Sequence, residues 1–300
     1  MIRRPQVTLV QLTYFVEAAR WRSMSTAANE LHVAQSAVSS AIAQLETQVG
    51  AQLFIRQRSK GLVLTVAGEQ FLRDARVLLA QVDEAIDAAR GIEHDVRGVV
   101  RIACFVTLAP FLLPKILSAL AEQHPQLLVD VIEVHADGAE EELRRGGVEL
   151  ALTYGFPYGA DIDVQVVTHS RPHVLLHPAH HLAKREAVSL RELADEPLIL
   201  LDLPRSREYF LGLLSGLGIE PRVRHRTTSY ETVRALVGRG HGYSILNQRS
   251  VSESTYEGSS VRTIEIADDV APLPIVVASL ATSRLSARGH AVADAIRATL

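Results

Sequence analysis

The sequence predicts a multi-domain fold that joins a winged helix-turn-helix unit, a long linker helix and a bilobal α/β unit. Short amphipathic segments and a basic hairpin pattern fill residues 1–64, and an uninterrupted heptad pattern fills residues 65–92. Strand and helix patterns then alternate over residues 98–300. We assign lobe I to residues 98–168 and 273–300, and lobe II to residues 169–272.

Composition limits the class of protein and its compartment. Of the 300 residues, 47% are hydrophobic and 22% are charged, which is an ordinary soluble composition. The sequence contains no run long enough to span a membrane and no N-terminal export signal, so we expect a cytoplasmic protein without a membrane partner. The single cysteine, Cys104, excludes an intramolecular disulfide and a cysteine-based metal cluster.

The net charge of −3 is unevenly divided along the chain. Residues 1–64 hold seven Lys or Arg and three Asp or Glu, a balance of +4, whereas the remainder holds 24 and 31, a balance of −7. A basic N-terminal unit on an acidic body indicates a polyanionic partner for the first part. A solvated basic face would give the same excess.

Apolar residues at helical spacing predict three helices in the first fifty residues. Ser25 is the expected N-cap of the second helix, and the third runs from Gln35 until Gly50 ends it. The outer face of the third helix is small and uncharged, so it can approach the floor of a DNA groove. A helical hairpin in an unrelated core is the alternative. The residues expected to contact DNA from this helix are Gln35, Ser36, Ser39 and Ser40.

A β-hairpin is predicted between residues 53 and 65, directly after the third helix. Two short apolar runs flank a basic tip that contains a glycine. Arg56, Arg58 and Lys60 of this hairpin can neutralise phosphates or enter the minor groove. The alternative is a solvated loop.

Residues 66–91 carry the longest uninterrupted helical pattern, for which Thr65 is the expected cap. Apolar residues alternate at steps of four and three over three heptads, and such a stripe requires a partner helix. We therefore expect a coiled coil that dimerises the protein, with a helix packed on its own domain as the alternative. The expected dimer stripe consists of Phe71, Ala75, Leu78, Val82, Ala85 and Ala89.

The alternation after residue 98 predicts a parallel sheet with helices on both faces, then a second α/β set. The last strand and a closing helix at residues 287–298 return to the first lobe, which predicts a hinged bilobal sensor. Ligands of open α/β sheets bind at the carboxyl ends of strands. The cleft between the lobes is therefore the expected ligand site.

Several segments resemble the LysR-type transcriptional regulators in order and spacing. The most specific are AANELHVAQSAVSSAIAQLETQVGAQLFIR and then LTVAG at residues 64–68, and the resemblance continues through LLPKIL, HPQLLVDV, GGVELAL, HPAHHLA, LADEPLI and GRGHGYSIL. It implies a winged-helix domain, a dimerising linker helix and an effector-binding domain like type 2 periplasmic binding proteins. It also implies a homotetramer on an interrupted palindrome in promoter DNA, whose bending changes with a small-molecule effector. RNA polymerase is a further implied partner.

The resemblance also assigns roles to single residues of the DNA-binding part. Gln35, Ser36 and Ser39 would face base edges or adjacent phosphates, and Arg56 with the other hairpin cations would hold the DNA backbone. Ala34 stands where the family often has a Ser cap. Ser40 stands where many members have Arg, which moves the expected specificity toward DNA shape.

In the C-terminal unit, Thr107 follows the first strand and can hold an anionic group or simply cap a helix. Arg205 or Arg207 can pair with a carboxylate or face solvent. Asn247 stands where the family usually has proline, and it is the preferred specificity determinant. We expect a small organic effector that is polar or anionic. The predicted effector-binding residues are Thr107, Asp202, Arg205, Ser206, Thr228, Ser229 and Asn247.

Other signals do not indicate catalysis, a cofactor or a metal. His173, His177, His180 and His181 cluster, but the resemblance places HPAHHLA on a surface turn, so no metal site is expected. GRGHG follows a helix and precedes a strand, the wrong order for a dinucleotide loop. The sequence shows no nucleophile elbow, paired catalytic carboxylates or phosphate loop, which argues against an enzyme. A transport solute-binding protein would leave the first 92 residues unexplained.

Overall fold

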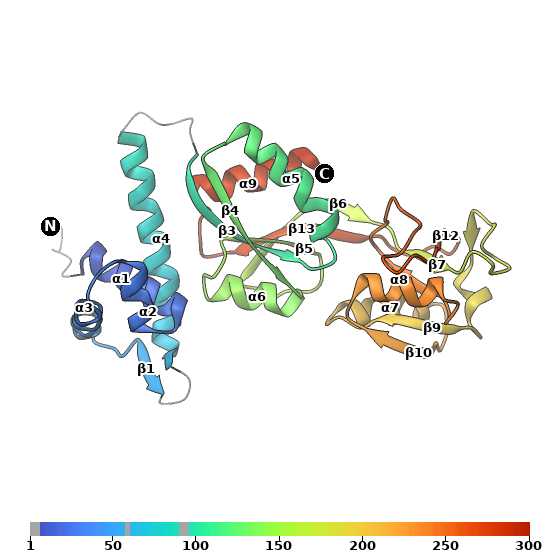
Figure 1. Cartoon of the computed structure of the whole chain (residues 1–300), viewed down its shortest axis with the longest axis horizontal. Coiled ribbons are helices and arrows are strands. Elements are labelled where there is room, and N and C mark those ends of the chain that lie inside the picture. Colours follow the sequence, from blue (N-terminus) through green and yellow to red (C-terminus); the bar gives the residue numbers. More distant parts are fainter. Residues whose placement is uncertain (1–6, 58–60, 90–95) are drawn as a thin grey trace.

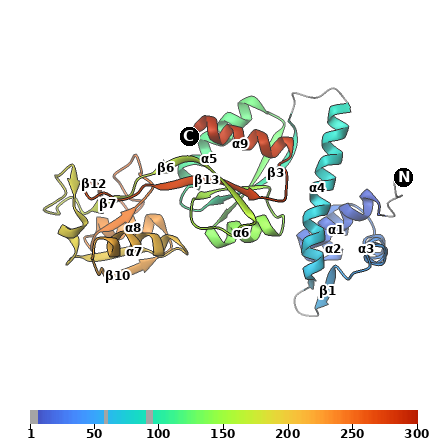
Figure 2. The same ribbon diagram turned by 180° about the vertical axis from the view of Figure 1, so that it is seen from behind.

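The computed structural model describes residues 7–57, 61–89 and 96–300, which form an elongated molecule (Figure 1). Three short helices lie at one end, lobe I lies in the middle and lobe II at the other end. The view from behind shows helix α4 (Val66–Ala89) standing between the N-terminal helices and lobe I (Figure 2). For residues 56, 57, 83–85 and 87–89 only the backbone is described. Every helix among the described residues is too short or too polar to cross a membrane.

The N-terminal unit is built around Phe15, which is fully buried. Its ring centre lies 5.2 Å from that of Phe54 on the hairpin and 5.4 Å from that of Phe71 on α4. The first turns of α4 therefore belong to the core of this unit. Its other elements are α1 (Leu9–Trp21), α2 (Met24–Glu30), α3 (Gln35–Val49), β1 (Phe54–Gln57) and β2 (Gly61–Leu64).

Helix caps follow the predictions with one exception. The Ser23 hydroxyl accepts the Thr26 N–H at 3.2 Å and caps α2, so the expected cap at Ser25 is wrong. Ala34, which directly precedes α3, offers no side-chain cap, as the sequence indicates, and Gly50 ends the helix with φ at 76°. This left-handed conformation favours glycine.

The hairpin is tied to α3 by Glu46. Its Oε1 atom accepts hydrogen bonds from the Leu53 N–H at 2.7 Å and the Phe54 N–H at 3.1 Å. Helix α4 passes so close to this turn that a Cβ atom on Gly68 would lie 2.1 Å from the Leu53 carbonyl oxygen. The position of the hairpin is therefore fixed from both sides, by a carboxylate of α3 and by the backbone of α4.

Lobe I is a five-stranded sheet with the strand order β4-β3-β5-β13-β6. Strand β3 runs parallel to β4 and β5, whereas β13 runs antiparallel to β5 and β6. The expected parallel sheet is thus wrong for one strand, β13, which runs against the other four because it returns directly from lobe II after β6 has left for it. The strands are β3 (Gly98–Phe105), β4 (Leu127–Val134), β5 (Leu150–Tyr154), β6 (Ile162–Ser170) and β13 (Leu273–Leu280).

Helices cover both faces of this sheet, as predicted (Figure 1). Ile102 and Cys104 of β3 point into the core that α5 and α9 cover, and Ala103 points into a smaller core with Ala139 and Leu143 of α6. This alternation follows the two-residue period of a strand. The helices are α5 (Ala109–Gln123), α6 (Ala136–Arg144) and α9 (Ala287–Thr299).

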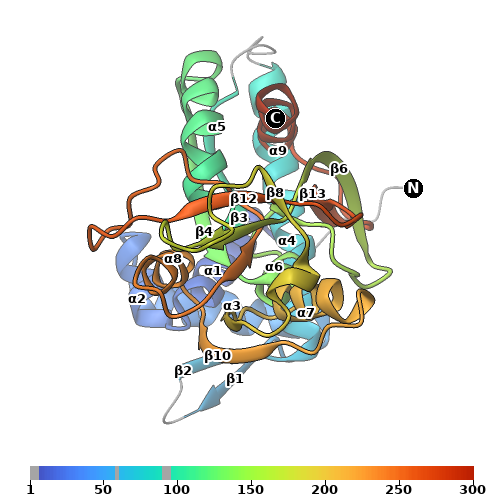
Figure 3. The same cartoon turned by 90° about the vertical axis from the view of Figure 1, so that its right-hand side faces the viewer.

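Lobe II contains the sheet β11-β7-β12-β8 and the parallel pair β10-β9. The Ile199 N–H donates to the Tyr243 carbonyl at 2.8 Å, which joins β9 to the chain entering β11. Figure 3 looks onto this lobe, with α7 and α8 toward the viewer. Its elements are β7 (His173–Leu176), β8 (Ala187–Val188), the 3₁₀ turn η1 (Leu190–Leu193), β9 (Pro197–Leu201), α7 (Ser206–Gly216), β10 (Arg222–Thr227), α8 (Tyr230–Gly238), β11 (Ser244–Leu246) and β12 (Arg262–Ile266).

We predict that Gly68→Ala lowers the free energy of unfolding of the N-terminal unit by about 1–3 kcal/mol, since the new methyl group must displace backbone on one side. Gly212→Ala is the matched control, because Gly212 lies within helix α7 and a Cβ there meets nothing within 4 Å. That change should stabilise the protein by about 0.5–1 kcal/mol. Urea unfolding of both variants measures these changes in the free energy of unfolding. Equal stability of Gly68→Ala and the parent would contradict the close approach of Gly68 to the Leu53 carbonyl.

Candidate nucleic-acid interface and ligand pocket

Helix α3 presents the polar face that the sequence predicts. Val38 and Leu45 are fully buried against the rest of the unit. Gln35, Ser36 and Ser40 are exposed on the other side, and Ser39 is half-buried at its margin. A helix with three exposed polar side chains near its N-terminus has the form of a DNA-reading helix.

The hairpin cations are only partly placed by the structure. Arg56 lies on strand β1, but its side chain, together with Arg58 and Lys60, lies outside the described residues. Their contact with the DNA backbone remains a prediction from the sequence.

The predicted dimer stripe divides into two parts along α4. Ala75 is only 1% exposed and packs in the N-terminal core, so its expected place at a dimer contact is wrong. Phe71 packs on Phe15 in the same core. Leu78, by contrast, is 48% exposed, and Val82 is half-buried. The side chains of Ala85 and Ala89 lie outside the described residues.

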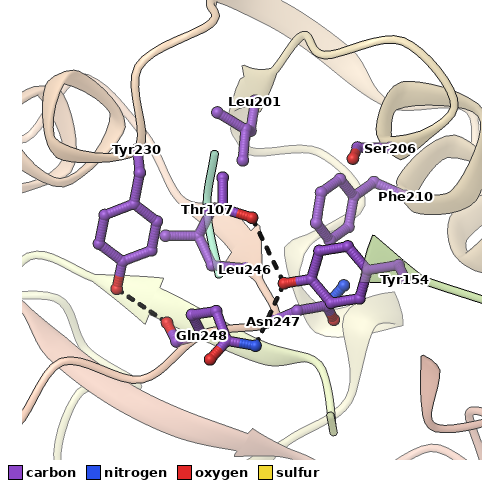
Figure 4. Close-up of a pocket in the computed structure, with 9 residues that line it drawn as sticks. All are labelled: Thr107, Tyr154, Leu201, Ser206, Phe210, Tyr230, Leu246, Asn247 and Gln248. Carbon is purple, nitrogen blue, oxygen red and sulfur yellow. Dashed lines mark hydrogen bonds between the residues drawn. The ribbon is translucent and has the colours of Figure 1, made fainter. Parts of the chain in front are cut away.

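A small cavity of about 10 Å³ lies between the lobes (Figure 4). Its walls come from the segment after β3, the carboxyl ends of β5, β9 and β11, the residues after β11, and the beginnings of α7 and α8. The cavity therefore lies at the carboxyl ends of strands, where we expect a ligand. The lining residues are Thr107, Tyr154, Leu201, Ser206, Phe210, Tyr230, Leu246, Asn247 and Gln248.

The Tyr154 hydroxyl is the centre of a hydrogen-bond network in this cavity. It lies 3.4 Å from the Thr107 hydroxyl and accepts a hydrogen bond from the Gln248 amide at 3.1 Å. That amide also donates to the Ser170 hydroxyl at 3.2 Å, and the Tyr230 hydroxyl donates to the Gln248 backbone carbonyl at 2.8 Å. Burial raises the pKa of Tyr154 and of Tyr230 to about 12, so both phenols stay neutral at physiological pH.

The side chain of Asn247 has a buried oxygen that accepts no hydrogen bond from the described residues. Its backbone carbonyl accepts a hydrogen bond from Ser170 at 2.6 Å, but its side-chain Oδ1 is buried without a hydrogen-bond partner in the described part of the chain. A buried acceptor without a partner costs free energy. A ligand that donates a hydrogen bond to Oδ1 would recover it.

Four of the seven predicted effector-binding residues lie outside this cavity. Arg205 pairs with acidic side chains of α6, and Asp202 pairs with Arg207 and Arg226. Thr228 is exposed. The Ser229 hydroxyl accepts the Thr232 N–H at 3.2 Å and so acts as the N-cap of α8. Thr107, Ser206 and Asn247 do line the cavity.

Sequence reasoning missed most of the aromatic and amide lining. Tyr154 ends strand β5, and Tyr230 begins helix α8 next to the cap Ser229. Gln248 directly follows Asn247. These three residues stand at or just after a strand or helix end, and that position was the available signal, whereas Phe210 lies within α7 and gives no such signal.

A second, wider groove of about 730 Å³ opens beside the cavity, on the side of α6 and α7. Arg205 and Arg207 line it together with the acids Asp137 and Glu208. Arg205 pairs with Asp137, and Arg207 pairs with Glu208, so neither cation is free to hold an anion alone.

The histidine cluster has a structural role. Ligand atoms of His180, His181 and Glu196 lie within 4.8 Å of one another. However, His180 Nδ1 accepts the Leu182 N–H at 3.2 Å, so in the neutral ring Nε2 carries the proton and donates to Glu196 at 2.7 Å. The protonated nitrogen offers no lone pair to a metal.

Two further buried groups have ordinary explanations. Burial lowers the pKa of His173 to about 4, which keeps it neutral inside lobe II. Burial also raises the pKa of the Cys104 thiol to about 12, so this thiol is unreactive at neutral pH.

Comparisons with known proteins match both parts of the chain. Residues 9–69 match the model described as bacterial regulatory helix-turn-helix protein, lysR family, and residues 93–300 match the LysR substrate binding domain. A probable hydrogen peroxide-inducible genes activator of Mycobacterium avium is 30% identical, over 82% of this chain and 79% of that protein.

Solved structures share the whole architecture. The crystal structure of HinK, a LysR family transcriptional regulator from Pseudomonas aeruginosa, is 33% identical with a TM-score of 0.67, and the match covers 98% of each chain. A full-length OxyR variant from Pseudomonas aeruginosa is 22% identical with a TM-score of 0.78, over 98% of this chain and 99% of that chain, which shows the fold alone.

These matches agree with the order of parts in the structure. A helix-turn-helix with an exposed polar face precedes a long helix and a two-lobed unit with a cavity between its lobes. The named relatives are transcriptional regulators, which are not enzymes. The chain belongs to the LysR family of transcriptional regulators, which join a helix-turn-helix DNA-binding domain to an effector-binding domain.

Proposed function

We propose that the interlobe cavity binds a small, uncharged effector and that its occupancy changes how the protein binds or bends promoter DNA. The observation that supports this most directly is the lining, which contains hydroxyl, amide, aromatic and aliphatic side chains but no charged group. The unpartnered Oδ1 of Asn247 adds a specific acceptor. The effector is therefore a molecule with a hydrogen-bond donor and a partly apolar body.

An anionic effector, which the sequence allowed, fits this cavity poorly. A carboxylate that enters a buried space without a cation loses hydration that neutral hydroxyls replace only in part. The nearby arginines are paired elsewhere. In this structure the cavity has room for about one water molecule, so an effector must widen it on binding. A neutral metabolite suits the lining.

For the DNA-binding part, we propose that Gln35, Ser36, Ser39 and Ser40 face the major groove. Arg56, Arg58 and Lys60 would hold phosphates. Exposure of Leu78 supports a dimer contact along the second half of α4, and we propose a homotetramer that works with RNA polymerase without catalysis of its own. The proposed domain boundaries are 1–64, 65–92 and 98–300.

We predict that a cell extract contains a component that raises the melting temperature of the full-length protein and passes through both anion- and cation-exchange resins. Asn247→Leu and Tyr154→Phe should each reduce this shift, because they remove a polar group that lines the cavity. Tyr209→Phe, which changes the neighbouring groove, should keep it. Retention of the stabilising component on the anion exchanger would contradict a neutral effector.

We predict that Gln35→Ala weakens binding to a promoter fragment selected by the purified protein by about 1–3 kcal/mol, without changing the salt dependence. Arg58→Ala should instead reduce the slope of log K against log salt by about one. Binding titrations at several salt concentrations measure both effects. Gln48→Ala, on an exposed residue near the other end of α3, is the matched control and should leave affinity unchanged. Parent-like binding by Gln35→Ala would show that this end of α3 does not read bases.

A further inference from the structure

Arg205 of lobe II directs its whole side chain into lobe I. Its Nε donates to Asp137 at 2.7 Å, its Nη1 donates to the Pro157 carbonyl at 2.8 Å, and its Nη2 donates to Glu140. The guanidinium also lies 5.1 Å from the ring centre of Tyr158. Asp137 and Glu140 both belong to α6, so one arginine fastens lobe II to this helix.

The backbone of Arg205 adopts a strained conformation. Its φ is 62°, in the region that non-glycine residues rarely adopt. It directly precedes α7, whose residues Ser206 and Phe210 line the interlobe cavity. A movement of α7 that changes the cavity must therefore strain or release the contacts of Arg205.

The other end of α6 is fastened to the linker helix. Arg73 of α4 donates to the Arg144 carbonyl, and Arg76 donates to the Gly146 carbonyl and, at 3.4 Å, to the Arg145 carbonyl. The last carbonyls of a helix lack partners within the helix and carry its negative dipole end, so cations bind well there. Burial, together with the neighbouring cations Arg101 and Arg145, lowers the pKa of Arg76 to about 10, and it remains charged at neutral pH.

A hydrogen-bond network centred on Glu140 connects the contact with Arg205 at one end of α6 to the contacts with α4 at the other end. Glu140 accepts from Arg205 on one carboxylate oxygen and from Arg144 Nη2 and the Gly159 N–H, each at 2.8 Å, on the other. Arg144 is also held by Asp161 at 2.8 Å. The chain of contacts thus runs from Arg205 through Glu140 and Arg144 to the linker helix.

Packing makes α6 behave as one body. Ala139 and Leu143 are buried in the core between the helix and the sheet of lobe I. The helix has nine residues and is about 13 Å long at 1.5 Å per residue. It lies between α4 and the helices of lobe II in both views (Figures 1 and 2). A short packed helix shifts as a unit because dense interiors do not deform continuously.

We propose that α6 is a mechanical link that passes movements of lobe II to the linker helix and so to the DNA-binding unit. Arg205 is the contact on the effector side, and Arg73 and Arg76 are the contacts on the DNA side. Glu140 is the positioning residue, because it contacts both Arg205 and Arg144. The link acts whatever the effector is, so it can be tested without a ligand.

Hydrogen–deuterium exchange of the full-length protein tests the link. In Arg205→Gln, amide exchange should rise several-fold around residues 137–140 and also at residues 144–147 and in α4 near Arg76. Arg207→Gln is the matched control, because Arg207 pairs with Asp202 and Glu208 inside lobe II, and only lobe II should respond. A rise confined to residues 137–140 in Arg205→Gln would overturn the proposal.

A change at the α4 end of the link, measured at the lobe II end, distinguishes coupling from a general loss of folding. Coupling between two sites is reciprocal, so Arg73→Gln should raise exchange in the first turn of α7. Asp137→Asn is a milder change than Arg205→Gln, since it removes one of the contacts of Arg205 at a largely exposed carboxylate. If Asp137→Asn and Arg73→Gln each change exchange only at their own end of α6, the link does not exist.

Discussion

The buried carboxylate of Glu140 is the interaction on which the arrangement of the three parts depends. It binds a cation from lobe II, a cation from its own helix and a backbone N–H that follows β5. A buried charge that loses a partner is strongly destabilising, so these groups hold one another in place. Burial alone would raise the pKa of Glu140, but the Gly159 N–H and the charges of Arg205 and Arg144 outweigh burial and lower it. Since the folded pKa lies below the unfolded one, this stabilisation is present at neutral pH and is lost only as the pH falls through the acidic range.

Charged and neutral side chains occupy separate regions between the two lobes. The ion pairs stand around the outer groove, where Arg205 and Arg207 are matched by acids, whereas the inner cavity contains only neutral groups that hydrogen-bond to one another. In the proposed function, ion pairs hold the lobes together while the cavity selects its ligand by shape and by the unpartnered acceptor of Asn247. The proposed preference for a neutral ligand rests on the lack of cations in the cavity lining, not on any single contact.

The local parts of the fold could be predicted from the sequence, and the long-range parts could not. Helix α3 and the closing helix follow from apolar periodicity, which acts over a few residues. Strand β6 was missed because its middle is an exposed edge without an apolar run. An apolar stripe with heptad spacing is the same whether the helix packs on a partner chain or on its own domain. For this reason Ala75 was predicted at the dimer contact although it packs in the N-terminal core. Arg205 was placed with the ligand because its pairing with Glu140 spans 65 residues and leaves no local pattern. Asn247 and Thr107 were found because strand ends have a recognisable position.

The most direct test of the link through α6 compares the affinities of Arg205→Gln, Arg207→Gln and the parent for a selected promoter fragment, all as full-length protein without added ligand. We expect Arg205→Gln to change the affinity, although Arg205 lies in the lobe farthest from the DNA-binding unit. Arg207→Gln should match the parent. Identical DNA binding by all three proteins would contradict the claim that lobe II is connected to the DNA-binding unit through α6.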